Sequence, residues 1–123
     1  MTATVRELAG EPALIVLGEG PPLDLARAVE LIGEAMGGGV TWVVIPAARL
    51  GDDFFRLRTG LAGEITQKFT NYRRKLAILG DVSRYVSQSD ALRDFIAESN
   101  RGPDIWFVAD LDSLAVRIAS INR

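Results

Sequence analysis

The chain has 123 residues with a net charge of −2, from 14 basic and 16 acidic side chains. This balance excludes the basic surface of a general nucleic-acid-binding protein. The sequence contains no cysteine and no histidine, which excludes thiol nucleophiles, zinc–thiolate sites and imidazole acid–base chemistry. No signal peptide opens the chain and no apolar run approaches the ~20 residues that span a bilayer, so we expect a cytoplasmic protein without a membrane partner.

The first predicted elements are two strands and a helix. The apolar runs Val5–Leu8 and Ala13–Leu17 flank the segment 9–12, which predicts a β-hairpin with a four-residue connection. Asp24 is the expected N-cap of a helix whose apolar residues follow a 3.6-residue period. Three glycines at 37–39 end that helix, because glycine readily adopts the left-handed conformation past a helix C-terminus.

The rest of the chain alternates strands with helices. Thr41–Ile45 is a continuous apolar, β-branched run, typical of a strand buried on both faces. A long amphipathic stretch from about Asp52 to Arg74 predicts the second helix. The remaining predicted elements are a strand at Lys75–Leu79, a helix capped within Ser87–Asp90 and ended by Asn100–Pro103, a strand at Ile105–Val108 and a helix capped by Asp110 or Asp112.

The predicted element order is β-β-α-β-α-β-α-β-α. Strands that alternate with helices indicate an α/β fold with a mixed, mostly parallel sheet of four or five strands and an antiparallel hairpin at its start. We expect residues 1–123 to form one domain. The expected core residues of the sheet are Val43, Ile45, Ala77, Leu79, Phe107 and Val108, with Trp42 and Trp106 beside them.

This order resembles the STAS domain, the fold of anti-sigma-factor antagonists. In that family a loop leads into a helix at the motif Asp-Ser-Ser-Gly-Leu, whose second serine is phosphorylated. The segment Leu57–Leu61 falls on this motif, with Thr59 at the phosphoacceptor position and with Leu57 and Arg58 in place of the Asp and the first Ser. The resemblance implies a STAS-like sandwich, a regulatory role and a Thr59 hydroxyl that solvent reaches in the first turn of the second helix.

A second resemblance covers most of the chain. The segments Trp42–Pro46, Asp53–Glu64 and Glu98–Gly102 are similar to a bacterial family labelled as a domain of unknown function, number four-one-eight-zero. This resemblance implies no activity. It implies that the chain corresponds to the family's complete unit.

The segment Arg56–Glu64 is the best candidate site. The first N–H groups of a helix lack internal partners and favour anions, and two arginines would add bidentate donors. The alternative is that Thr59 is an N-cap, that the glycines permit close packing and that the arginines are solvated. The expected ligand- or partner-binding residues are Arg56, Arg58, Thr59, Gly60, Gly63, Glu64, Gln67 and Asp81.

Two other charged groups have weaker functional interpretations. Acidic residues at predicted strand exits could hold Mg²⁺, although aspartate before a helix is the usual capping residue. They are Glu19, Asp52, Asp53, Asp81 and Asp110. The cations of Tyr72–Lys75 could contact phosphate, or could complement the dipole of a helix C-terminus. We expect no catalytic residue, no metal and no cofactor.

Two functions fit the sequence. The favoured one is a small regulatory or interaction module of STAS-like type that binds an anionic ligand, a protein partner or a second copy at the N-terminus of the second helix. The alternative is a small enzyme, independent of histidine and cysteine, that acts on an anionic metabolite through arginine and aspartate residues. A deep pocket that joins Arg56, Arg58 and Asp81 would favour the enzyme, and a flat helix face would favour the module.

Overall fold

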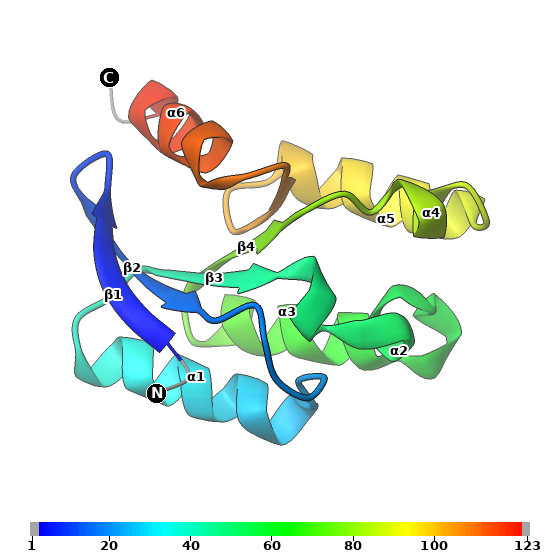
Figure 1. Cartoon of the computed structure of the whole chain (residues 1–123), viewed down its shortest axis with the longest axis horizontal. Coiled ribbons are helices and arrows are strands. Elements are labelled where there is room, and N and C mark those ends of the chain that lie inside the picture. Colours follow the sequence, from blue (N-terminus) through cyan, green and yellow to red (C-terminus); the bar gives the residue numbers. More distant parts are fainter. Residues whose placement is uncertain (1–2, 122–123) are drawn as a thin grey trace.

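The fold is an α/β arrangement around a five-stranded mixed sheet, seen in a computed structural model that describes residues 3–121 (Figure 1). The strands are β1 (Ala3–Leu8), β2 (Glu11–Val16), β3 (Trp42–Pro46), β4 (Lys75–Leu79) and β5 (Ile105–Val108). Their order in the sheet is the order in the chain; β1 pairs with β2 antiparallel, and all other pairs are parallel. This confirms the predicted α/β class and the mixed, mostly parallel sheet.

Helices cover both faces of the sheet. The α-helices are α1 (Leu25–Gly37), α2 (Gly51–Phe55), α3 (Leu61–Asn71), α4 (Ser83–Val86), α5 (Asp90–Arg101) and α6 (Leu111–Ile121), with short 3₁₀ turns η1 (Ala47–Arg49) and η2 (Leu57–Thr59). Buried residues of α1, α2, α3 and α5 form one apolar cluster with one face of the sheet. Helix α6 covers the other face, and Figure 1 shows α1 and α6 on opposite sides.

The sheet interior follows the alternation of side chains along each strand. Val43 and Ile45 of β3 point into the larger cluster, whereas Trp42 and Val44 point into the cluster under α6. The Trp42 and Trp106 rings meet there with centroids 4.8 Å apart. Both tryptophans are buried as predicted. Of the predicted sheet core, Leu79 and Val108 are only half-buried.

The connection of the hairpin is shorter than predicted. Leu8 pairs with Glu11, so only Ala9 and Gly10 form the turn, and both have positive φ, at 50° and 84°. Such a two-residue turn matches the twist of the flanking strands. The prediction was wrong because Glu11 and Pro12 read as turn residues. Pro12 lies in β2 before the residues that pair with β3, where strand proline is tolerated.

The predicted helix from Asp52 to Arg74 is broken into α2, η2 and α3. Gly60 has φ of 79°, a left-handed conformation that a continuous helix cannot contain, and it separates η2 from α3. The 3.6-residue spacing of apolar side chains continues across this break, so the sequence pattern alone did not predict it. At the other end, α3 ends at Asn71 and is capped by Tyr72, and Arg73 takes φ of 56° in the position past the helix end that glycine usually fills.

Side-chain caps fix where three helices begin. The carboxylate of Asp24 accepts the N–H of Arg27 at 2.8 Å at the start of α1. The Ser89 hydroxyl accepts the N–H of Leu92 at 3.1 Å, and Asp110 accepts the N–H of Ser113 at 2.8 Å. The structure thus confirms the predicted Asp24 cap, places the second within Ser87–Asp90 at Ser89, and selects Asp110 over Asp112.

A buried arginine holds the loop between β2 and α1. Arg49 is 4% exposed, and its guanidinium donates to the carbonyls of Leu17, Glu19 and Pro21 at 2.8–3.1 Å. Gly20, between these acceptors, has φ of 140°, and a Cβ there would lie 2.8 Å from Arg49 Cζ. The loop therefore closes around the guanidinium.

Candidate functional site

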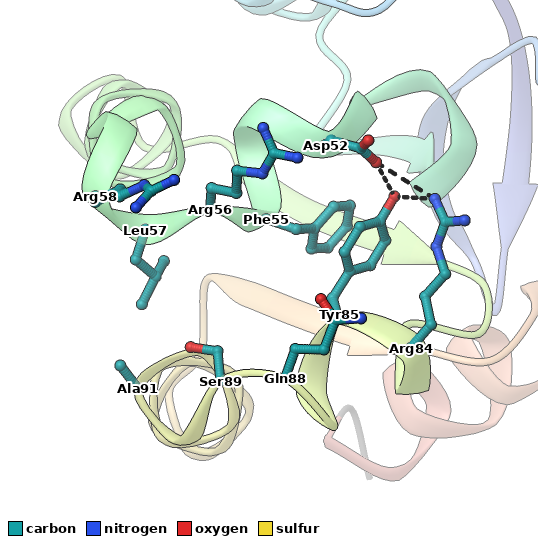
Figure 2. A pocket seen from close by; sticks show the side chains of 10 residues that line it. All are labelled: Asp52, Phe55, Arg56, Leu57, Arg58, Arg84, Tyr85, Gln88, Ser89 and Ala91. Atoms are coloured by element: carbon teal, nitrogen blue, oxygen red, sulfur yellow. Dashed lines mark hydrogen bonds and ion pairs between the residues drawn. The ribbon is translucent and has the colours of Figure 1, made fainter.

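A cleft of about 560 Å³ opens between two segments that follow neighbouring strands. One wall is α2 and η2, which come after β3; the other is α4 and the start of α5, which come after β4. The carboxyl ends of parallel strands meet at one edge of a sheet, which brings the two walls together. The lining residues are Asp52, Phe55, Arg56, Leu57 and Arg58 on the first wall and Arg84, Tyr85, Gln88, Ser89 and Ala91 on the second (Figure 2).

Aromatic stacking joins the two walls. The Tyr85 ring lies on the buried Phe55 ring, with centroids 4.4 Å apart and an angle of 9° between the planes. The Arg84 guanidinium carbon is 4.5 Å from the centroid of the Tyr85 ring, and Figure 2 shows it on the side away from Phe55. Tyr85 is therefore fixed between an apolar ring and a cation.

A hydrogen-bonded cluster closes one end of the cleft. The Tyr85 hydroxyl donates to Asp52 Oδ1 at 2.7 Å, and an Arg84 nitrogen lies 3.3 Å from the same oxygen and also contacts the Tyr85 hydroxyl. The Tyr85 hydrogen bond lowers the pKa of Asp52, with further lowering from the charges of Arg84 and Arg56. Asp52 is thus ionised at neutral pH, and Arg84 balances its charge.

Two other arginines of the cleft are not held in an ion pair. Arg56 and Arg58 are exposed, and within residues 3–121 neither forms an ion pair, whereas Arg27, Arg84, Arg93 and Arg101 do. Figure 2 shows both on the first wall, with Arg58 at the opposite end of the view from Asp52. The cleft therefore carries uncompensated positive charge.

Thr59 lies outside the cleft lining, in η2, and the prediction that placed it in the first turn of the second helix was wrong. Gly60, in the left-handed conformation, separates Thr59 from α3, which begins at Leu61. Its side chain is exposed, but its hydroxyl is 2.7 Å from the Asp53 carbonyl and 2.9 Å from the Arg56 carbonyl and accepts the Leu61 N–H at 3.2 Å. The Thr59 hydroxyl thus links η2 to α2 and accepts the hydrogen bond of the first N–H group of α3.

The other predicted site residues are dispersed. Gly60, Gly63, Glu64 and Gln67 belong to α3 or its start and do not line the cleft. A Cβ at Gly63 would meet open space, so no close packing requires that glycine. The Gln67 side chain donates to Asn71 at 2.8 Å.

Asp81 also lies outside the cleft lining. Its carboxylate accepts the N–H of Ser83 at 2.9 Å at the start of α4. Hydrogen bonds from the side chain and the backbone of Ser83 lower the pKa of Asp81. Of the predicted set, the cleft contains Arg56 and Arg58.

Comparison with known proteins identifies the family. The family model described as "Domain of unknown function (DUF4180)" matches residues 9–118. The chain belongs to this family. No curated protein and no solved structure matches the chain.

Part of the cleft of this DUF4180 chain was not predicted from the sequence. Arg84 and Tyr85 lie on α4, a helix of four residues that is too short for a periodic pattern to show. The available signal was the pair Asp81 and Ser83, whose spacing suits a turn in which the carboxylate accepts an N–H two residues on. Asp52 was considered as a cap or a metal ligand, but it contributes to the cleft as the partner of Tyr85 and Arg84.

Two further observations concern metal binding and membrane spans. Across residues 3–121, histidine, cysteine and acidic side chains nowhere gather in a group of three or more that could hold a metal ion. In the same part of the chain, no helix is both long and apolar enough to cross a membrane.

Proposed function

We propose that this protein is a non-catalytic interaction module that binds an anionic ligand or partner in the cleft between η2 and the α4–α5 segment. The observation that carries the proposal is the pair Arg56 and Arg58, which line the cleft and form no ion pair within the described residues. Guanidinium groups match carboxylate and phosphate oxygens in a bidentate geometry.

The charge and size of the cleft support an anion. Its lining contains three arginines and one aspartate, a balance of +2 in a chain of net charge −2. A volume of about 560 Å³ lies within the range of small-molecule sites. Ser89, the N-cap of α5, also lines the cleft, so the positive end of that helix dipole adds to the attraction.

Several finer expectations stay part of this proposal. They are a STAS-like arrangement in one domain, a regulatory role in the cytoplasm, and a protein partner or self-association. The sequential hairpin and parallel strands support the STAS-like arrangement. The half-buried Gly60 and the exposed residues Gly63, Glu64 and Gln67 would then extend the contact surface along α3, and Thr59 would remain a candidate phosphoacceptor.

The geometry favours a module over the alternative enzyme. The enzyme hypothesis needs a pocket that joins Arg56 and Arg58 to Asp81, and Asp81 instead lies outside the lining and accepts the Ser83 N–H at the start of α4. The carboxylate in the cleft, Asp52, is held by Tyr85 and Arg84. A carboxylate with a lowered pKa is a weak general base at neutral pH.

A thermal-shift experiment tests the proposal. Phosphate, sulfate, citrate and a panel of metabolite anions are added to the wild-type protein and to the double variant Arg56→Gln/Arg58→Gln. We expect at least one anion to raise the melting temperature of the wild type by several degrees and not that of the variant, because a ligand that binds only the folded state stabilises it.

The double variant Arg93→Gln/Arg101→Gln is the matched control, because these arginines are also exposed, on α5, but form ion pairs with acidic side chains and do not line the cleft. It should keep the wild-type shift. An anion effect of equal size in all three proteins would show that binding is not at the cleft and would contradict the proposal.

A further inference from the structure

The ionic groups of the cleft are arranged along its length. Asp52, held by Tyr85 and Arg84, lies at one end, and Arg58 lies at the other with Arg56 between them (Figure 2). The Asp52 carboxylate repels an incoming anion from its own end. The favourable position for an anionic group is therefore beside Arg56 and Arg58.

The net charge of the cleft lining indicates how many negative charges a ligand at this position should carry. Three arginines and Asp52 leave a balance of +2 in the lining. A phosphomonoester carries about −1.5 to −2 at neutral pH, and its oxygens accept several hydrogen bonds from paired guanidinium groups. A monocarboxylate would compensate only half of this charge.

The cleft is also larger and more apolar than a bare anion requires. Leu57 is half-buried, and Figure 2 shows its side chain pointing from the first wall toward Ala91 and Ser89 on the second. The stacked rings of Phe55 and Tyr85 lie beside this gap. An apolar substituent placed there would contact Leu57 and Ala91 and would lose contact with water.

We infer that the ligand is an organic phosphomonoester with an apolar ester group, the phosphate bound by Arg56 and Arg58 and the apolar group against Leu57 and Ala91. This inference rests on the proposed function and specifies its ligand class. The same chemistry is presented by a free aryl or alkyl phosphate and by a phosphotyrosine side chain of a partner protein.

Calorimetric titration of the folded protein tests the ligand class. The probes are inorganic phosphate, phenyl phosphate, benzoate and phenol. We expect phenyl phosphate to bind at least about tenfold more tightly than phosphate, because several carbons leave water on binding. Benzoate should bind more weakly than phenyl phosphate, and phenol should show no binding.

Variants separate the two halves of the site. Arg56→Gln/Arg58→Gln should weaken phosphate and phenyl phosphate alike, whereas Leu57→Asn should remove the preference for phenyl phosphate and leave phosphate unchanged. Since Leu57 also packs against the core, Ala91→Gln is a second variant. Ala91 is exposed in the first turn of α5, so this neutral variant should fold, should weaken phenyl phosphate binding at least about tenfold and should leave phosphate binding unchanged.

The outcomes distinguish this inference from the proposed function. Equal affinity for phosphate and phenyl phosphate, or for benzoate and phenyl phosphate, overturns the ligand class while anion binding stands. If none of these probes binds and no anion shifts the melting temperature, both fail. A phosphotyrosine peptide that binds more tightly than phenyl phosphate supports a protein source of the ester, and equal affinity supports a free small ester.

Discussion

Two sets of arginines follow β3 within ten residues of each other, and the structure uses them in opposite ways. Arg49 is 4% exposed and donates to three backbone carbonyls of the loop between β2 and α1. Arg56 and Arg58 are exposed, and in the described residues neither forms an ion pair. The first region has its hydrogen-bonding capacity committed to the fold, and the second keeps its capacity for another molecule.

The difference shows what separates a structural cation from a binding cation. Burial makes each unmade hydrogen bond expensive, so a buried guanidinium persists only where acceptors surround it. An exposed guanidinium is hydrated at little cost and can exchange water for a ligand. The residue type is the same at both places, and the distinction comes from the loop that closes over Arg49.

The largest expected effect is that of Arg49→Met. The change keeps much of the aliphatic stem but leaves the carbonyls of Leu17, Glu19 and Pro21 without their donor. We expect a loss of about 3 kcal/mol in the free energy of unfolding, measured by urea denaturation. Arg56→Met is the matched control and should change it by less than about 0.5 kcal/mol. Equal effects at the two positions would contradict the comparison.

A smaller effect is expected at Gly20. A Cβ there would lie 2.8 Å from Arg49 Cζ, and φ of 140° is strained for any other residue. Gly20→Ala should therefore cost about 1–3 kcal/mol, because the guanidinium cannot move away without breaking its hydrogen bonds. In the Arg49→Met background the steric part of this cost should disappear, and urea denaturation of the four proteins gives the coupling. Additive effects would show that the loop does not close on the guanidinium.

The smallest expected effect concerns the ionic cluster of the cleft. The pKa of Asp52 is lowered in the folded state, first by the Tyr85 hydrogen bond, so its contribution to stability is present above the ordinary pKa of 3.8 and is lost as the pH falls through the lowered value. The melting-temperature difference between wild type and Asp52→Asn should shrink on acidification through this range. A difference that is constant with pH would contradict the assignment.

Carboxyl NMR titration sharpens this test. Tyr85→Phe removes the hydrogen bond that lowers the pKa of Asp52 most, so that pKa should rise toward 3.8. Asp81 is the internal control, because Ser83 and not Tyr85 lowers its pKa. An unchanged Asp52 pKa in this variant would show that the hydroxyl does not hold the carboxylate.

The sheet could be predicted from the sequence because its strands are continuous apolar runs. The strands β3 and β4 are predicted by the apolar runs Thr41–Ile45 and Lys75–Leu79. The starts of two helices are predicted by Asp24 and Asp110. Interruptions of a helix were harder to predict. The apolar period of the second predicted helix continues past Gly60, and only the left-handed φ of that residue separates η2 from α3.

The site was only half predictable for a related reason. Arg56 and Arg58 were identified because two arginines beside glycines exceed what folding requires. The second wall depends on α4, which is too short to leave a pattern, and on the parallel pairing of β3 with β4, which brings residues about 30 positions apart together. Arg49 was not singled out, because its burial depends on the closure of the loop at 17–22 around it.

The strand order described above has a consequence for how the chain reaches this structure. Every strand pairs with its neighbour in the sequence, from β1 through β5. No strand must be inserted between two that have already paired, so each unit can add to an existing edge as it leaves the ribosome. The first wall of the cleft is then complete before the second is synthesised, and the contact of Tyr85 with Phe55 and Asp52 forms as the growing chain adds α4.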